Sequence, residues 1–370
     1  MARHTAIVDV GLDRLREMMR GNFSLAWMDA NPQGWGHSAT PGPAGLGLVD
    51  IETGHYAQIP DHASSRASPA PRGCHVPAGI ASSDLHDLND RSVLWSDNVA
   101  RLYDEAVSRQ WNSLTDVPWD QLGELPTDLE KALCQMCTGL AQAELGAADL
   151  TAGWMSRISP GFHEVKLFLA TQIMDEARHM EVFRKRALAN GGGLLIASPC
   201  QQRLTSLIRH APDYAAAGAL MNVLAKGFSL ALYHCGSFLA PGEVEETIFR
   251  LCMQDQARHL AYGVRHLEWF LGHHPERTED IHAILDAGEQ AIFELTLEPQ
   301  TIEPRAILAG DGLQDIRAGL SQVAFVYARQ VREYLRRLKV AGVDRQSRIR
   351  IPVELPLGRV GAERTQERMR

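Results

Sequence analysis

Two stretches of this sequence are near copies of each other: QIMDEARHMEVF at residues 172–183 and CMQDQARHLAYG at residues 252–263. The first contains a Glu-x-x-His motif, Glu176 and His179, and the second has Gln-x-x-His at the same spacing. Residues three apart lie on one face of an α-helix, so each copy presents an oxygen donor beside a histidine. One glutamate has become a glutamine, which raises the question of what such a site can still do.

The surrounding residues predict a bundle of long helices. From about residue 94 onward, apolar residues recur at helical spacing, and turns such as NGGG and APGE separate the helical stretches. We find no alternating pattern of the kind that predicts a β-strand. The sequence therefore predicts an all-α protein with long helices at about 127–157, 162–190, 212–239, 242–272, 278–298 and 312–340.

The two ends of the chain differ from this helical domain, which we place at residues 91–340. Residues 1–90 are rich in Gly, Pro, Ser and His and lack a sustained apolar period, so we expect a loop-like extension with a short helix near residues 11–20. Residues 341–370 carry seven arginines and two prolines, which indicates a solvated tail with no assigned partner.

The composition argues against several kinds of partner and location. A formal net charge of −8 gives no electrostatic reason to bind nucleic acid or an anionic membrane. We find no apolar run close to the roughly 18 residues of a membrane-spanning helix and no signal peptide, so we expect a cytoplasmic protein.

The six cysteines show no disulfide framework. Cys134 and Cys137 form a C-x-x-C within an apolar helix, where packed thiols are a simpler interpretation than redox chemistry.

Two charged residues lie on apolar faces of the helices next to the repeats. Glu144 is flanked by small apolar residues, and a buried acid should be paired or bound to a metal because an uncompensated buried charge is costly. The helix between the repeats, ALMNVLAKGFSLALYH, contains no acid, and its charged residue is Lys226. In a four-helix bundle, carboxylates from two helices and Glu-x-x-His motifs from the other two can converge on a pair of metal ions. This sequence has one Glu-x-x-His motif and one of the two further carboxylates, Glu144.

From about residue 94 to residue 272 the chain resembles the ferritin-like superfamily, in the branch around the ribonucleotide reductase small subunit and its oxidase and N-oxygenase relatives. The resemblance is carried by LYDEAVSRQWNSLTDVPW, LAQAEL, EVKLFLATQIMDEARHMEVFRKRALANGG and QDQARHLAYGVRHL. It implies a ferritin-like four-helix bundle with additional helices, and O2-dependent oxidation of a small organic molecule by iron. Carried over residue by residue, it implies these metal ligands: Glu144, Glu176, His179 and His259.

Three positions depart from the pattern of that superfamily. Lys226 stands where a terminal glutamate is expected, and Gln256 stands where the second bridging glutamate is expected. Phe183 stands where the reductase relatives have their radical-forming tyrosine, so we do not expect a tyrosyl-radical ribonucleotide reductase subunit.

The first two departures change the metal chemistry that we expect. They make the cavity three charge units more positive, and two like unit charges 4 Å apart repel by about 4 kcal/mol at an effective dielectric of 20. We therefore expect one iron ion rather than two, with these ligands: Glu144, Glu176 and His179. Lys226 would replace the second ion, and Lys226 and Gln256 are the catalytic candidates. Asp175 and Asp255 are expected to orient the histidines.

Two other interpretations stay open. Lys226 with Glu144 or Glu176, plus Gln256, could form a buried polar network without metal, in a catalytically silent homologue that pairs with an active ferritin-like subunit. Lys226 could also have a lowered pKa and act as a base or amine nucleophile, although the adjacent carboxylates oppose this. The expected partners are a small organic substrate and O2, and a second ferritin-like subunit in a homodimer or heterodimer.

Overall fold

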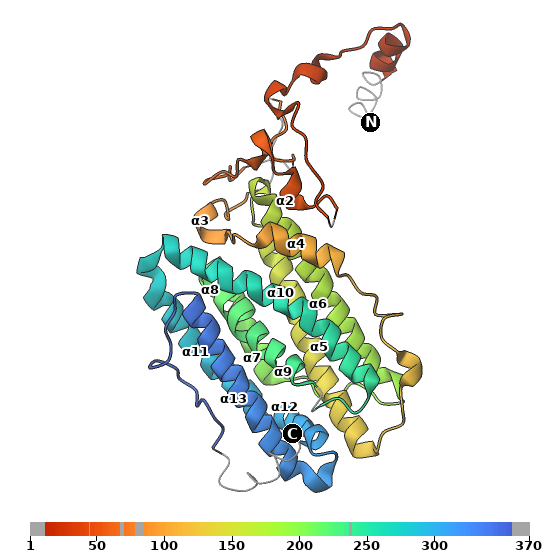
Figure 1. Cartoon of the computed structure of the whole chain (residues 1–370), viewed down its shortest axis with the longest axis vertical. Helices are drawn as coiled ribbons and strands as arrows, with labels where there is room; N and C mark the ends of the chain where they lie inside the picture. The colour runs from red at the N-terminus through yellow and green to blue at the C-terminus, as the bar shows by residue number, and fades with distance from the viewer. Residues whose placement is uncertain (1–11, 44, 67–69, 78–84, 237–238, 357–370) are drawn as a thin grey trace, which may run out of the picture.

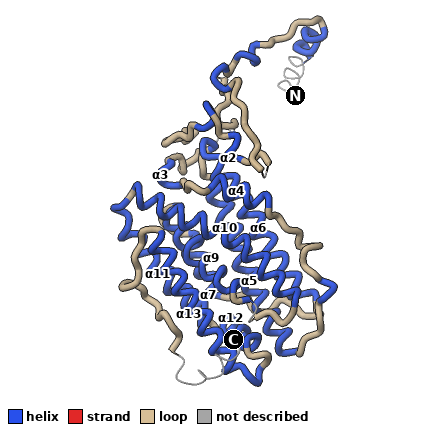
Figure 2. Tube along the Cα trace, viewed as in Figure 1, coloured by secondary structure: helices blue, strands red, loops and turns tan. Residues whose placement is uncertain are grey.

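The computed structural model describes residues 12–43, 45–66, 70–77, 85–236 and 239–356. Within these residues the chain forms helices joined by loops, and no strand occurs among them (Figure 2). This confirms the all-α prediction. The long helices begin and end within a few residues of the predicted bounds, because glycine, proline and capping residues mark their ends in the sequence.

Four long helices form the centre of the bundle (Figure 1). Helix α5 packs against α6, α6 against α10, and α10 against a helix made of three consecutive parts. Their bounds are α5 (Thr127–Met155), α6 (His163–Ala189), α10 (Glu243–His273), and then α8 (Tyr214–Gly218), a π-helical segment (Ala219–Ala225) and α9 (Lys226–His234) in one continuous run.

Further helices surround this centre. Two of them were predicted, α11 (Thr278–Leu297) and α13 (Ile316–Val340), as was the helical stretch that contains α4 (Val99–Ser108). The prediction missed α7 (Pro199–Arg209) and α12 (Pro299–Ala309). Each begins with a proline at its first position, which helices tolerate. Helix α12 also contains Pro304, which normally indicates a helix end.

The π-helical segment lies very close to α10. A π-helix bonds each residue to the fifth one along, which widens one turn and shifts the faces of the helix that follows. Here α9 follows at once, and its first residue, Lys226, is buried. On the facing helix, a Cβ added to Gly263 would lie 2.4 Å from the Cβ of Asn222. Only glycine leaves room for this approach of the two backbones.

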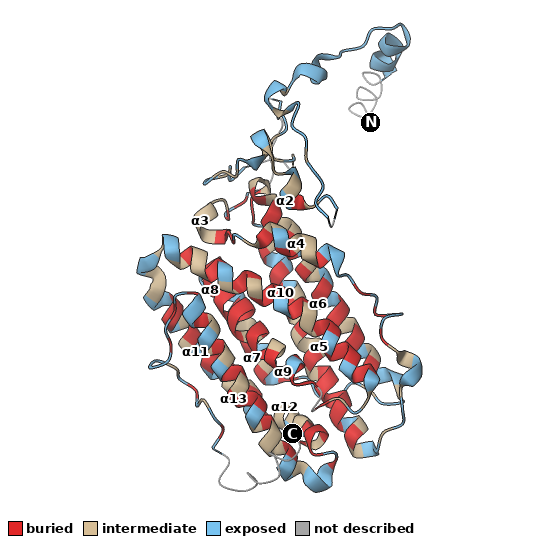
Figure 3. Cartoon of the chain, in the orientation of Figure 1, coloured by how far each residue is buried: buried red, intermediate tan, exposed pale blue. Residues whose placement is uncertain are grey.

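One helix is apolar over a longer stretch than we expected from the sequence. Tyr214–His234 is long and apolar enough to cross a membrane by length and composition. However, 83% of its apolar window is buried inside the protein, in the interior that Figure 3 shows as buried. Its place in the bundle core accounts for its apolar composition.

The N-terminal extension rises beyond one end of the bundle and is largely exposed (Figures 1 and 3). Residues 12–19 form the short helix that was expected near its start. An ion-pair cluster anchors the extension to the bundle: Arg72 contacts Glu52 at 2.7 Å and Glu164 of α6 at 2.6 Å. Arg72 therefore joins the extension to the first turn of α6.

Residues 341–356 pack against the bundle, which differs from the solvated tail that we expected, and residues 357–370 of that predicted tail lie outside the described residues. Arg345 is buried and contacts Glu289 of α11 at 2.8 Å and Asp286 at 2.5 Å. Val343 and Ile351 are buried beside them. The arginine count indicated a solvated segment because a sequence does not show which basic residues meet buried acids.

We expect Gly263→Ala to destabilise the protein by about 1–3 kcal/mol, because the added methyl group overlaps with Asn222. Chemical denaturation monitored by circular dichroism measures the change. The matched control is Gly153→Ala in α5, where nothing lies within 4 Å of the new Cβ. That control should leave stability unchanged or raise it by up to about 1 kcal/mol. Equal stabilities for the two variants would contradict the close contact.

Candidate metal centre

The structure brings together all six residues that the sequence singled out as ligands or catalytic candidates. They come from four helices, and each is at most 4% exposed: Glu144 on α5, Glu176 and His179 on α6, Lys226 on α9, and Gln256 and His259 on α10. The apolar stripes of these helices turn the polar residues inward, so the core of the bundle holds a compact polar centre.

Lys226 lies between two carboxylates. Its Nζ donates to Oε2 of Glu144 at 3.0 Å and to Oε2 of Glu176 at 2.6 Å. Burial lowers the pKa of Lys226, but the two carboxylates outweigh burial and raise the pKa above its ordinary value. The two carboxylates therefore favour the ammonium form of Lys226, which argues against the hypothesis of a neutral lysine that acts as base or nucleophile.

Two further donors converge on the same carboxylates. The amide Nε2 of Gln256 donates to Oε2 of Glu144 at 3.2 Å and to Oε2 of Glu176 at 3.4 Å. The hydroxyl of Tyr233 donates to Oε1 of Glu144 at 2.7 Å. Sequence reasoning missed the role of Tyr233, although it lies two helical turns after Lys226 on the same stripe.

Each histidine is held by an acid from the other repeat. Nε2 of His179 lies 3.0 Å from Oδ2 of Asp255, and Nε2 of His259 lies 3.1 Å from Oδ2 of Asp175. Asp175 and Asp255 thus contact the histidines, as the sequence predicted for them. These contacts leave Nδ1 of each ring facing the carboxylates: Nδ1 of His179 lies 3.7 Å from Glu176, and Nδ1 of His259 lies 3.0 Å from it.

The arginines of the two repeats complete this support. Arg178 contacts Asp175 and also Asp255, the latter at 2.9 Å. Arg258 contacts Asp255 and reaches across to Asp175 at 3.2 Å. Trp111 donates to Asp255 at 2.8 Å. The repeated Asp-x-x-Arg-His thus forms a nearly symmetric network beneath the centre, a role that sequence reasoning missed for both arginines although the repeat itself contained the signal.

The donors fall into two groups with respect to a metal ion. Glu144, Glu176 and His179 each offer one ligand atom within 4.8 Å of the others. However, the ammonium of Lys226 already bonds Oε2 of both carboxylates, and these are the oxygens nearest to His179. An ion in this group would have to displace the ammonium.

The second group lies on Glu176, Gln256 and His259, and each of these residues has a buried atom without a hydrogen-bond partner in the described part of the chain. Three buried atoms have no hydrogen-bond partner among the described residues: Oε1 of Glu176, Oε1 of Gln256 and Nδ1 of His259. The first and third lie 3.0 Å apart, so they form an ion pair when His259 is protonated and are both free to bind a cation when it is neutral. Two donors that each bind one ion at about 2.1 Å and at a right angle lie about 3.0 Å apart. The donors on this side therefore fit a metal ion.

The charged groups of the centre are close to balance. Four acids face three bases here: Glu144, Glu176, Asp175, Asp255, Lys226, Arg178 and Arg258. In their usual ionised forms they leave one negative charge over. Burial lowers the pKa of both histidines, but their neighbours outweigh burial and raise it: Cys252 and Asp255 at His179, and Glu176 and Asp175 at His259. A proton on one of the histidines, or a bound cation, balances the remaining charge.

We expect Lys226→Met to destabilise the metal-free protein by roughly 3–5 kcal/mol at pH 7, because Glu144 and Glu176 lose their buried counter-charge. Lys226 holds the pKa of Glu176 well below its ordinary value against the effect of burial. The resulting stabilisation is present above about pH 4.5 and is lost as the pH falls through the lowered pKa. The difference between variant and wild type should therefore narrow below about pH 4.5.

Urea denaturation at several pH values measures this effect. Lys339→Met, at an exposed lysine of α13 without an ion pair among the described residues, is the matched control and should change stability by less than about 0.5 kcal/mol. A pH-independent loss in Lys226→Met would contradict the electrostatic explanation.

Comparisons with known proteins identify the fold. No protein family matches the sequence, and no curated protein matches it either. The chain is similar to three solved structures of R2-like ligand-binding oxidase variants with an anaerobically reconstituted Mn/Fe cofactor. Their sequence identities are 17%, 15% and 16%, and their TM-scores are 0.55, 0.54 and 0.52. Each match covers 66% of this chain and 94% of the other. The chain therefore has the ferritin-like, ribonucleotide reductase small subunit-like fold of these oxidases.

Proposed function

We propose that the chain is a ferritin-like non-haem metal oxidoreductase that catalyses O2-dependent oxidation of a small organic molecule at a one-ion centre. The three unpaired buried atoms on Glu176, Gln256 and His259 carry this proposal. Buried polar atoms are nearly always paired in folded proteins, so such atoms on three neighbouring residues support a bound ligand here. The Mn/Fe cofactor named for the similar oxidases is in line with a metal at this place in the fold.

We assign the ion to Glu176 and His259, with the amide oxygen of Gln256 as a third donor. From the sequence we expected the ion on Glu144, Glu176 and His179, and we expected Lys226 in the place of the second ion. The contacts of Lys226 favour the reverse arrangement, because its ammonium uses the carboxylate oxygens nearest to His179. Carboxylate, amide and imidazole donors suit ferrous iron or manganese, which would supply the reduction of O2 and the oxidation of the substrate.

The protein's own groups prepare this centre. Asp175 holds Nε2 of His259, which fixes the ring so that Nδ1 faces the centre. Lys226 bonds one oxygen of Glu176 and leaves the other free, so the carboxylate joins an ammonium to the proposed ion site. The hydroxyl of Tyr233 donates a hydrogen bond to Glu144, which places an exchangeable proton within the centre. All of these groups are buried, so bulk water is excluded.

A second candidate function is a metal-free structural subunit that pairs with an active ferritin-like chain. The observation that favours it is the pair of contacts from Lys226 to Glu144 and Glu176, which joins α5, α6 and α9 without an ion. Metal content separates the two functions, because the structural subunit needs no ion to fold. The subunit partner and the cytoplasmic location stay predictions.

We expect about one ion per chain after anaerobic loading with ferrous iron and removal of loose metal, and O2 uptake in proportion to bound iron. His259→Ala should reduce both at least tenfold, because it removes a nitrogen donor. His234→Ala, at an exposed histidine of α9, is the matched control and should match the wild type. Elemental analysis and an oxygen electrode provide the measurements.

Two results would contradict this assignment. A folded wild-type protein that retains no metal would favour the structural subunit. Retention of the ion in His259→Ala together with its loss in His179→Ala would move the ion to the side of Glu144.

Restoring the two carboxylates should restore a second metal site. We expect Lys226→Glu/Gln256→Glu to bind about two ions per chain, because the change removes the ammonium and adds two oxygen donors. The control Lys339→Glu/Gln314→Glu makes the same change in net charge at exposed positions and should keep the wild-type ion count. An unchanged count in the first variant would show that Lys226 and Gln256 do not set the number of ions.

A further inference from the structure

A cavity of about 750 Å³ lies where the N-terminal extension meets the turn between α5 and α6 (Figure 1). The extension supplies one side of its wall, including both ends of the short helix α2 (Leu48–Ile51), and the bundle supplies the other side, including Pro160 and Leu167. Cavities of about 300–1,000 Å³ with a mostly apolar wall and a few polar groups are typical sites for small organic ligands.

This cavity is separate from the metal centre. His163, the first residue of α6, lines the cavity, and Glu176 of the centre follows it by 13 residues on the same helix. At 1.5 Å per residue these two positions lie about 20 Å apart. A small ligand in the cavity therefore does not reach the proposed ion, and its binding neither needs that ion nor rests on the proposed function.

Two polar side chains of the cavity wall are more than nine-tenths buried, and each has an atom without a partner. The side chain of Arg72 is 9% exposed, and His86 is 6% exposed. Nε of Arg72 and Nδ1 of His86 have no hydrogen-bond partner among the described residues. Buried polar atoms are nearly always paired, and Nε of a guanidinium can only donate. A ligand with acceptor oxygens would supply what is missing at Arg72.

Lys166 of α6 adds a third nitrogen group to the wall. Its Nζ donates to the main-chain oxygens of Met155 and Ile158, each at 2.9 Å, and no acid forms an ion pair with it in the described part of the chain. An ammonium has three N–H groups, so one is left for a ligand.

The acids near the cavity are already engaged. Glu52 contacts Arg72 at 2.7 Å and His163 at 2.9 Å, and Glu164 contacts Arg72 at 2.6 Å. These two carboxylates balance the charges of Arg72 and Lys166, so the region becomes positive when a histidine of the wall takes up a proton. The spare hydrogen-bonding capacity therefore lies on donors, and a bound anion would favour protonation of the histidines.

We propose that this cavity binds a phosphate ester of a small organic molecule, with the phosphate at Lys166, Arg72 and His86 and the organic group against apolar residues such as Leu48 and Leu167. A phosphate offers three strong acceptor oxygens, which suits a wall with several separate donors. The cavity also adjoins the first turn of α6, where the helix dipole favours an anion. Such a ligand would join the extension to the bundle, because its contacts come from both.

The test is calorimetric titration of the metal-free full chain with phenyl phosphate, hexyl phosphate, inorganic phosphate, benzoate and phenol. We expect at least one of the two esters to bind once per chain. Inorganic phosphate should bind at least tenfold more weakly than that ester because it lacks the apolar contacts. Phenol and benzoate should also bind at least tenfold more weakly, because phenol lacks the anion and benzoate offers only two oxygens.

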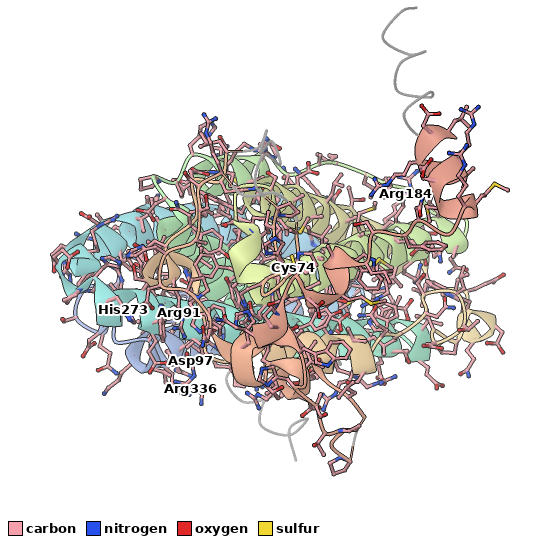
Figure 4. The ribbon with its side chains drawn as sticks, turned by 90° about the horizontal axis from the view of Figure 1, so that it is seen from above. Cys74, Arg91, Asp97, Arg184, His273 and Arg336 are labelled. Atoms are coloured by element: carbon pink, nitrogen blue, oxygen red, sulfur yellow. The ribbon has the colours of Figure 1, made fainter. Side chains whose placement is uncertain are left out.

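Substitutions in the wall locate the site. Lys166→Gln and His86→Leu should each weaken binding of the ester at least tenfold, and Lys166→Arg, which keeps the charge, should weaken it less. The matched controls are Lys131→Gln, at an exposed lysine of α5, and His273→Leu, at an exposed histidine labelled in Figure 4. Both controls should bind within twofold of the wild type.

Limited proteolysis distinguishes a ligand that joins the two parts from one that binds elsewhere. The ester should slow tryptic cleavage after Arg66, an exposed residue of the extension, at least fivefold in the wild type and not in Lys166→Gln. His259→Ala, in the metal centre, should bind the ester like the wild type. The proposal is overturned if neither ester binds, if phenol or benzoate binds equally well, if Lys166→Gln and His86→Leu bind like the wild type, if His259→Ala abolishes binding, or if the ester leaves cleavage unchanged.

Discussion

The contact of one ammonium with two carboxylates determines the rest of this centre. Lys226 lies within hydrogen-bond distance of Glu144 and Glu176, and so joins α5, α6 and α9 in the core of the bundle. A buried ion pair of this kind stabilises a fold little compared with apolar packing, yet removal of one partner is very costly. The bundle therefore depends on Lys226 because this side chain supplies a buried counter-charge to two acids. The same contact decides which oxygens remain for a metal, and hence on which side an ion fits.

The network of acids and arginines beneath the centre is the same whichever side of Glu176 an ion would bind. Asp175 and Asp255 each hold a histidine of the other repeat, and Arg178 and Arg258 hold both acids. These contacts cross between α6 and α10, so they fix the two helices in register whether or not an ion is bound. Such a network also explains why the two repeats share Asp, Arg and His although they differ at Glu176 and its counterpart. The acids orient both histidines so that their Nδ1 atoms face the carboxylates, and Lys226 uses the carboxylate oxygens nearest to His179.

The sequence predicted the long helices and the six residues of the centre because both follow from local patterns. Helical periodicity shows which faces are buried, and a polar residue on a buried face is conspicuous. Helices α7 and α12 were missed because prolines and polar residues dominate their local pattern, while tertiary packing determines their structure. The position of the Lys226 ammonium could not be predicted either, since a flexible side chain with four rotatable bonds reaches either carboxylate from the same backbone.

The electrostatics of the centre limit what Lys226 can do there. Burial lowers its pKa, but Glu144 and Glu176 outweigh burial and raise it, which favours the ammonium form. The ammonium bonds one oxygen of each carboxylate. A ligand that needs these two oxygens must therefore displace the ammonium, whereas a ligand that binds Oε1 of Glu176 leaves both contacts of Lys226 intact.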